Sequence, residues 1–145
     1  MFKWRNILII LLFLGLLVSV YLTIEHFQPS VLICPNTGII SCETVLTSKY
    51  SVILGMPLEI IVLIWFIIAM LLSIYEQKIS NKDLLTIWFM VGSAGVLYSF
   101  TSQYLLGKIC VYCMSLDAIL ILSSAIIFYN TIKVWNANKQ PVQMK

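Results

Sequence analysis

The chain has 145 residues, of which 61% are hydrophobic and 10% are charged, and its formal net charge is +3. A soluble domain of this size carries about 25% charged residues and fewer than half apolar ones. The excess of apolar residues therefore excludes an ordinary water-soluble domain and indicates an integral membrane protein. The small net charge, without a dense basic cluster, gives no support for a nucleic-acid partner.

Four apolar segments follow one another along the chain, at residues 7–24, 56–75, 84–106 and 109–132. Each has about the 18–20 residues that a helix needs to cross about 30 Å of hydrocarbon. The first follows Lys3 and Arg5, as in a signal peptide, but no small-x-small cleavage site comes after it, so we expect a retained span. The sequence predicts an all-α integral membrane protein, a four-transmembrane-helix bundle surrounded by lipid, with residues 1–145 forming a single domain.

Positive charge predicts the orientation of these spans. Of the nine Lys and Arg residues, only Lys49 and Lys108 lie on one side, which leaves seven on the side of the termini. The positive-inside rule then places both termini in the cytoplasm, and we expect the plasma membrane. Aromatic residues that suit the interface lie at the same ends of the spans: Trp4, Tyr75, Trp88 and Trp135. All four cysteines consequently fall on the extracytoplasmic side, where disulfides form and persist.

Residues 25–55 form the only sizeable segment outside the predicted spans. Within it, residues 43–52 are predicted to form a short external helix that lies on the bundle. Val45, Leu46 and Tyr50 are the apolar positions of that helix.

The sequence Cys110-Val111-Tyr112-Cys113 is the sharpest chemical signal in the chain. Two intervening residues place both sulfurs on one face at a helix start, close enough for a reversible disulfide. Gly107 can end the third span, so we expect Cys110 in the first turn of the fourth. Unpaired backbone N–H groups there, together with Lys108, favour a thiolate. The same spacing is half of a zinc site, but on the oxidising side of a membrane a redox role is favoured.

The second pair, Cys34 and Cys42, has seven residues between its members and is less specific alone. One interpretation is a structural disulfide across a short loop, which contributes about 2–3 kcal/mol. The other is a mobile shuttle that exchanges with both a soluble partner and the first pair. Disulfide exchange runs from sulfur to sulfur through mixed disulfides, so a relay requires two pairs arranged in this way.

In the order and spacing of its motifs, over nearly its whole length, the chain resembles the vitamin K epoxide reductase family. The matching residues are Cys34-Pro35, the run at 41–50 that includes Cys42, Ser48 and Tyr50, Leu54-Gly55-Met56-Pro57, and Cys110-Val111-Tyr112-Cys113. Some bacterial members carry a fused thioredoxin-like domain. This chain ends shortly after its fourth span, so we expect a bacterial or archaeal type without that domain and a separate thioredoxin-like partner on the outer side.

The resemblance also implies roles for individual residues. Cys113 would react with a quinone, Cys110 would exchange with Cys42, and Cys34 would receive electrons from the partner. Ser48 matches a position that hydrogen-bonds a quinone carbonyl, and Leu46 would line the same pocket. Bacterial members form disulfides, whereas vertebrate members reduce vitamin K and its epoxide.

Asp117 lies four residues after Cys113, hence on the same helical face and about 10 Å deeper than Cys110. An acid at such a depth costs about 2.5–3.5 kcal/mol and usually marks a site or a buried hydrogen-bond network. Asp117 either contacts and protonates the quinone or bonds to a neighbouring helix. For Glu59, a complement to the helix dipole is favoured over quinone contact. We assign His26 no role.

The sequence therefore predicts a membrane thiol:quinone oxidoreductase that uses a ubiquinone, menaquinone or vitamin K type of quinone. Reduction of vitamin K quinone or its epoxide by the same site stays open. A different class, a thiolate metal-binding protein, is disfavoured because only Cys110 and Cys113 have common zinc spacing and no second histidine supports them. A scaffold with two structural disulfides is the remaining alternative.

Overall fold

The computed structural model describes residues 2–28, 33, 37–79 and 82–138. Its elements in chain order are α1 (Phe2–Phe27), α2 (Cys42–Leu46), the 3-10 helix η2 (Lys49–Ser51), β1 (Val52–Ile53), β2 (Met56–Pro57), α3 (Leu58–Ile79), α4 (Lys82–Leu106) and α5 (Val111–Asn138). Among these residues, α1, α3, α4 and α5 are long and apolar enough to cross a membrane. The predicted all-α membrane bundle is confirmed.

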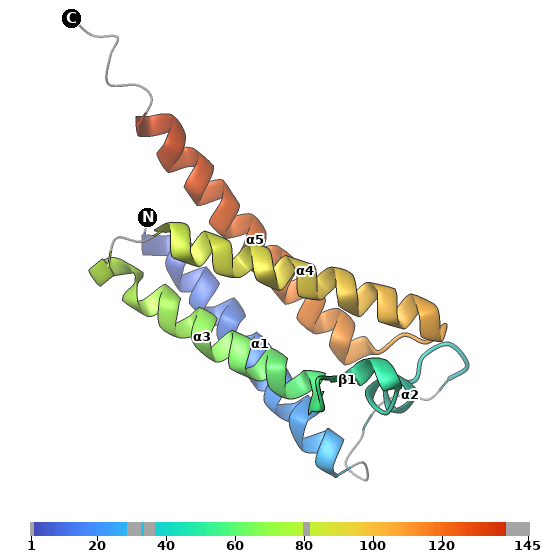
Figure 1. Cartoon of the computed structure of the whole chain (residues 1–145). Coiled ribbons are helices and arrows are strands. Elements are labelled where there is room, and N and C mark those ends of the chain that lie inside the picture. The colour runs from blue at the N-terminus through green and yellow to red at the C-terminus, as the bar shows by residue number, and fades with distance from the viewer. Residues whose placement is uncertain (1, 29–32, 34–36, 80–81, 139–145) are drawn as a thin grey trace, which may run out of the picture.

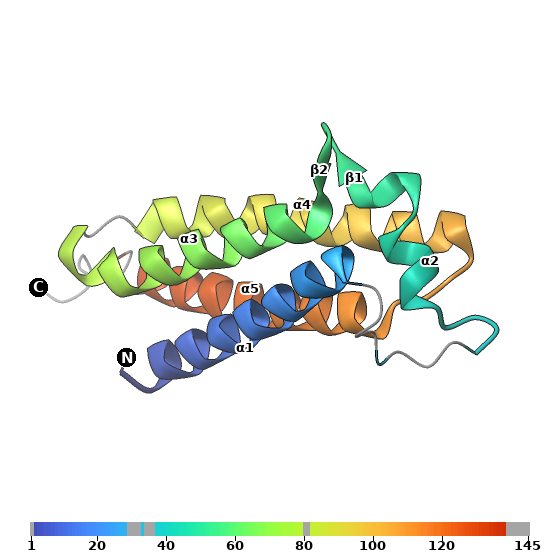
Figure 2. The same cartoon turned by 90° about the horizontal axis from the view of Figure 1, so that it is seen from below.

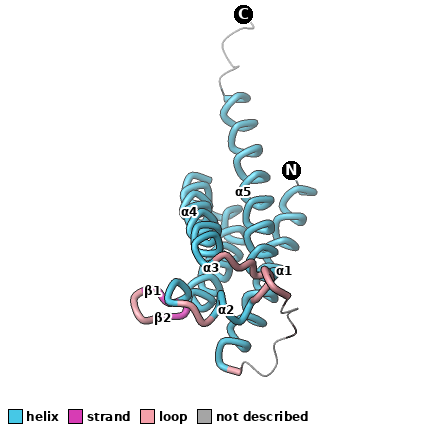
Figure 3. The backbone as a smooth tube through the Cα atoms, turned by 90° about the vertical axis from the view of Figure 1, so that its right-hand side faces the viewer, coloured by secondary structure: helices cyan, strands magenta, loops and turns pink. Residues whose placement is uncertain are grey.

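The four long helices lie side by side, and the short elements cover one end of the bundle (Figures 1 and 2). We call this end the α2 end; it holds the end of α1, the start of α3, the end of α4 and the start of α5. Figure 3 looks onto it, with α2 and the β1–β2 hairpin in front. The N-terminus lies at the opposite end, where α5 extends away from its neighbours.

A cluster of aromatic rings fills the middle of the bundle. Trp65 packs edge-on against Phe66 and Phe89, both fully buried, and stacks on Trp88 with ring centroids 6.1 Å apart. A Cβ atom at Gly92 would come within 2.5 Å of Trp65, so the absence of a side chain lets α3 and α4 approach. Trp88, expected as an interfacial anchor, therefore packs inward because its ring completes this cluster.

Several predicted boundaries move where the chain turns. The first helix continues through Phe27, beyond the predicted end at residue 24. The second predicted span began at residue 56, but Met56–Pro57 form β2, paired with β1, and the helix starts at Leu58. Leu54 and Gly55 connect the strands with φ of 53° and 83°. Positive φ at both central residues is the geometry of a tight hairpin turn, which stops the helix from starting earlier.

The predicted helix over residues 43–52 is wrong in extent. α2 ends at Leu46, η2 follows, and Val52 belongs to β1. Hydroxyl groups explain the break, because they donate to nearby backbone carbonyls and compete with a continuous helix. Thr47 Oγ1 donates to Glu43 at 2.7 Å, and Ser48 Oγ donates to Val45 at 2.8 Å.

Candidate active site

The Cys110–Cys113 pair stands at the junction of α4 and α5. Gly107, with a φ of 61°, ends α4 as expected. Cys110 directly precedes α5 instead of lying in its first turn, and its Sγ faces the backbone N–H of Cys113, with 3.4 Å between sulfur and nitrogen. A side chain in this position caps the helix N-terminus and meets the positive end of its dipole. Both cysteines are free thiols; Cys110 is 0% exposed and Cys113 is half-buried.

The immediate surroundings of Cys110 favour its thiolate. A hydrogen bond from the Cys113 thiol lowers the pKa of Cys110, and the backbone N–H groups of Tyr112 and Cys113 add to the effect against burial and the nearby Glu25 carboxyl. Thiolate, not thiol, is the nucleophile in disulfide exchange. Lys108 was expected to add positive charge near Cys110. Its ammonium group instead donates a hydrogen bond to the carbonyl of Gly38.

Main-chain pairing fastens the segment before Cys42 to the segment before Cys110. Ile40 forms a parallel bridge with Ile109, whose N–H donates to the Ile39 carbonyl at 2.9 Å. The N–H of Ser41 donates to the Ile109 carbonyl at 3.1 Å. Cys42 and Cys110 are the residues that follow, and both belong to the buried core, with Cys42 1% exposed.

Cys42 is disulfide-bonded, whereas Cys110 and Cys113 are not. Cys34, the expected first acceptor of electrons, lies outside the described residues. The described cysteines therefore comprise Cys42 in a disulfide and a reduced Cys110–Cys113 pair. A relay in which the loop pair reduces the CxxC pair has this composition once that transfer is complete.

A chain of hydrogen bonds connects Asp117 to Cys110. Ser99 Oγ donates to Asp117 Oδ2 at 2.7 Å, and Gln103 Nε2 donates to Ser99 Oγ at 3.3 Å. Gln103 Oε1 accepts the backbone N–H of Cys110 at 2.9 Å. Asp117 therefore makes the helix–helix bond that was one of its two interpretations. Sequence reasoning missed Gln103, for which a polar residue near the end of an apolar span was the available signal.

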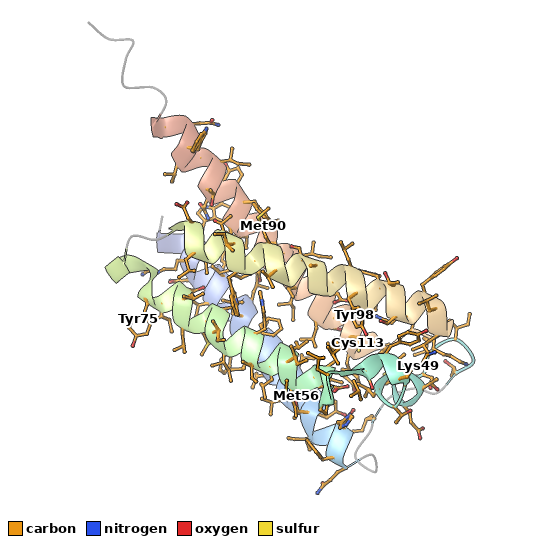
Figure 4. All side chains as sticks on the ribbon, in the orientation of Figure 1. Lys49, Met56, Tyr75, Met90, Tyr98 and Cys113 are labelled. Carbon is orange, nitrogen blue, oxygen red and sulfur yellow. The ribbon has the colours of Figure 1, made fainter. Side chains whose placement is uncertain are left out.

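The expected quinone-lining residues lie at the α2 end as well. Leu46 is buried in the cluster that contains Cys42 and Cys110, with Cys113 packed against it. Ser48 is half-buried and donates its hydroxyl hydrogen to Val45, so a bond to a carbonyl elsewhere requires rotation of that side chain. Figure 4 shows Cys113, Tyr98 and Lys49 at this end.

Tyrosine side chains hold several segments together at this end of the bundle. The Tyr112 ring lies 5.2 Å from that of Tyr21 on α1, and its hydroxyl donates to the Ile33 carbonyl at 2.8 Å. The Tyr98 hydroxyl of α4 donates to the Tyr50 carbonyl at 2.9 Å, which tethers η2 across the bundle end.

Three ionisable residues for which the sequence predicted no part in the chemistry also lie at the α2 end. Glu25 and Glu59 are buried, and His26 Nδ1 lies 3.7 Å from Glu59 Oε2. They come together because α1 ends and α3 begins at the same end of the bundle. Across the described part of the chain, no group of three or more His, Cys, Asp or Glu side chains is arranged to hold a metal ion.

A model of the vitamin K epoxide reductase family matches residues 6–129, which is most of the chain. The comparison with curated proteins gave no match.

Proposed function

The chain belongs to the vitamin K epoxide reductase family, and we propose that it is a thiol:quinone oxidoreductase that forms disulfide bonds. The family is one of membrane oxidoreductases that use quinones and work with thioredoxin-like partners. In this proposal electrons enter at Cys34 from a separate thioredoxin-like protein, pass through Cys42 to Cys110, and leave from Cys113 to a quinone. The acceptor is a ubiquinone, menaquinone or vitamin K type of molecule.

The hydrogen bond between Ser41 and Ile109 carries the proposal. The bond joins the Ser41 nitrogen to the Ile109 carbonyl oxygen at 3.1 Å and so holds together the residues just before Cys42 and Cys110. Transfer between the two pairs therefore needs only a local movement. Two disulfides of a scaffold would not need a free CxxC pair beside the loop cysteine. The lowered pKa of Cys110 makes its sulfur the better leaving group when Cys34 resolves the Cys42–Cys110 mixed disulfide.

The residues that share the α2 end with Cys113 fit a quinone. Leu46 would offer an apolar surface to the quinone ring, and Ser48 and Asp117 would offer polar groups to its oxygens. A buried Glu59 oxygen without a hydrogen-bond partner among the described residues offers a further polar contact. When bound, a quinone accepts the two electrons and two protons that the dithiol gives up.

The membrane arrangement follows from the same chemistry. The α2 end faces the extracytoplasmic space, both termini face the cytoplasm, and the membrane is the plasma membrane. Four apolar helices and the excess of Lys and Arg on the side of the termini support this orientation. Residues 1–145 act as a single domain in this proposal.

The test is purified protein with a reduced thioredoxin-like partner, assayed spectrophotometrically against ubiquinone and menaquinone analogues and vitamin K epoxide. We expect quinone reduction and oxidised partner in equal amounts. Asp83→Asn, at the exposed start of α4, is the matched control for substitution itself. If only the epoxide supports turnover, vitamin K epoxide reduction replaces the proposal. If none of the acceptors supports turnover, both functions are refuted.

A further inference from the structure

Glu59 is a buried acid that no assigned step uses. Its side chain is 5% exposed, and its Oε2 atom has no hydrogen-bond partner within the described residues. Burying a carboxylate without full hydrogen bonding is strongly unfavourable. A helix-dipole role alone would be served equally by an exposed acid in the first turn. The burial of Glu59 therefore calls for a partner that binds its free oxygen, at least transiently.

Two features of the surroundings identify that partner as a proton in transit. On one side, His26 Nδ1 lies 3.7 Å from Glu59 Oε2, and the histidine side chain is 24% exposed, so it reaches the surface. On the other side, Glu59 lies in the first turn of α3 and Cys113 in the first turn of α5, at the same end of the bundle, and the charge of Glu59 acts on the Cys113 sulfur. The buried carboxyl thus has a histidine that reaches the surface on one side and, at the same bundle end, the thiol that is expected to react with the quinone.

Asp117 provides an internal comparison. It also acts electrostatically on Cys113, but its Oδ2 already accepts a short hydrogen bond from Ser99 at 2.7 Å. Ser99 in turn accepts from Gln103, so Asp117 is held in a fixed network on the α4 side. Of the two acids that act on Cys113, Glu59 is the one with an oxygen that lacks a hydrogen-bond partner among the described residues and with a histidine leading to the surface.

We propose that Glu59 is the proton-relay residue of the Cys113 thiol and that His26 connects it to the aqueous surface at the α2 end. The inference rests on the proposed function and deepens it. Oxidation of the pair forms one S–S bond and releases two protons and two electrons from Cys110 and Cys113. The quinone takes up two electrons and two protons. Glu59 accepts the Cys113 proton as the sulfur reacts, and the carboxyl then passes it to the quinone oxygen or to His26.

Other ionisable groups border this path. Glu25 of α1 acts on Cys110, and Tyr21 lies beside Glu25. Asp117 and Cys110 act on Cys113 from the α5 side. The charge of Glu25 acts on the first thiol of the motif and that of Glu59 on the second, so substitution of Glu25 separates a general effect of negative charge from the relay.

The first experiment needs no quinone. In Cys34→Ser/Cys42→Ser protein, infrared difference spectra are recorded as the soluble oxidant diamide converts the Cys110–Cys113 dithiol to its disulfide. We expect a carboxyl C=O band that changes on oxidation, disappears in Glu59→Gln, and persists in Asp117→Asn and Glu25→Gln. A band that Glu59→Gln leaves unchanged would overturn the relay. Such a result leaves the thiol:quinone proposal intact.

The second experiment measures quinone reduction against pH with dithiothreitol as the donor. General acid–base groups contribute about 10²- to 10⁴-fold, so we expect Glu59→Gln to lose at least about 10-fold, with Glu59→Asp and His26→Gln in between. Small acids such as formate should partly restore Glu59→Ala, which a structural role would not permit. If Glu59→Gln does not fold, Glu59→Asp and His26→Gln decide the case: rates and pH profiles equal to wild type in both would refute the relay. Absence of quinone reduction by the wild type would instead refute the proposed function.

Discussion

Gln103 Oε1 accepts the backbone N–H of Cys110 at 2.9 Å, so a side chain from the end of α4 satisfies the buried start of the CxxC motif. Replacing Gln103 by Leu leaves that N–H unpaired, and a buried unsatisfied group costs about 1–3 kcal/mol. We expect a lower unfolding temperature in detergent and slower turnover. Gln103→Glu retains an acceptor oxygen and is the matched control. Equal stability of the Leu variant and wild type would show that the bond contributes nothing.

The Cys113 thiol controls the acidity of Cys110. It donates the hydrogen bond that lowers the pKa of Cys110, so Cys113→Ala should raise that pKa, and thiolate should form only at higher pH. Cys113→Ser keeps an O–H donor and should raise the pKa of Cys110 less than Cys113→Ala does. The measurement is ultraviolet thiolate absorbance against pH in the Cys34→Ser/Cys42→Ser background, in which Cys110 is the remaining cysteine of either variant. An identical midpoint in both variants would contradict the assigned donor.

Removal of Cys113 should also trap the exchange step. The CxxC disulfide cannot form without Cys113, but Cys110 can still attack the loop disulfide in the reverse of the proposed step. No Cys113 thiol is then left to carry the exchange beyond the Cys42–Cys110 mixed disulfide. In cells expressing Cys113→Ser, we expect a Cys42–Cys110 bond that mass spectrometry identifies after alkylation of free thiols. Cys110→Ser is the control and should give no such species. Finding Cys110 bonded only to Cys34 would reverse the proposed order of the relay.

The two cysteine pairs should respond differently to the choice of electron donor. Cys34→Ser or Cys42→Ser should abolish turnover with the protein partner. Dithiothreitol should still support it, because the half-buried Cys113 remains accessible to a small thiol. Cys110→Ser and Cys113→Ser should be inactive with both donors. Equal loss in all four variants with dithiothreitol would argue against separate roles for the pairs.

Gly92 and Gly95 on α4 give a matched test of helix packing. A Cβ at Gly92 meets Trp65 at 2.5 Å, whereas a Cβ at Gly95 has no other atom within 4 Å. Overpacking costs about 1–3 kcal/mol, so Gly92→Ala should lower thermal stability. Gly95→Ala should leave stability equal or slightly higher, because Ala is the better helix former. Equal effects of the two substitutions on stability would contradict the conclusion that the lack of a side chain at Gly92 allows α3 and α4 to pack closely.

Hydropathy and spacing predicted the four spans and the position of the CxxC motif, because burial in lipid requires long apolar helices whatever the details. They did not predict the hairpin, since Leu54 adopts a φ of 53° that its side chain does not favour. The predicted external helix was longer than α2 because the hydroxyl groups of Thr47 and Ser48 donate to backbone carbonyls and interrupt the helix.

Contacts between distant segments were the least predictable part of the site. His26 and Glu59 meet only because the end of α1 packs against the start of α3. Gln103 reached Cys110 through the turn at Gly107, whose geometry the sequence suggests without fixing which side chain points back. In each case the apolar pattern placed the helix, and packing decided the rotation about its axis.

The complete burial of Cys110 has a consequence for which molecules can exchange electrons with it. A large thiol such as a folded protein or a charged tripeptide cannot bring its sulfur to Cys110 while residues 39–41 remain paired with Ile109. Access is therefore restricted to a sulfur carried by the chain itself. Such a barrier keeps the oxidised motif from being reduced by the wrong thiol, and it makes selectivity a property of steric exclusion rather than of redox potential.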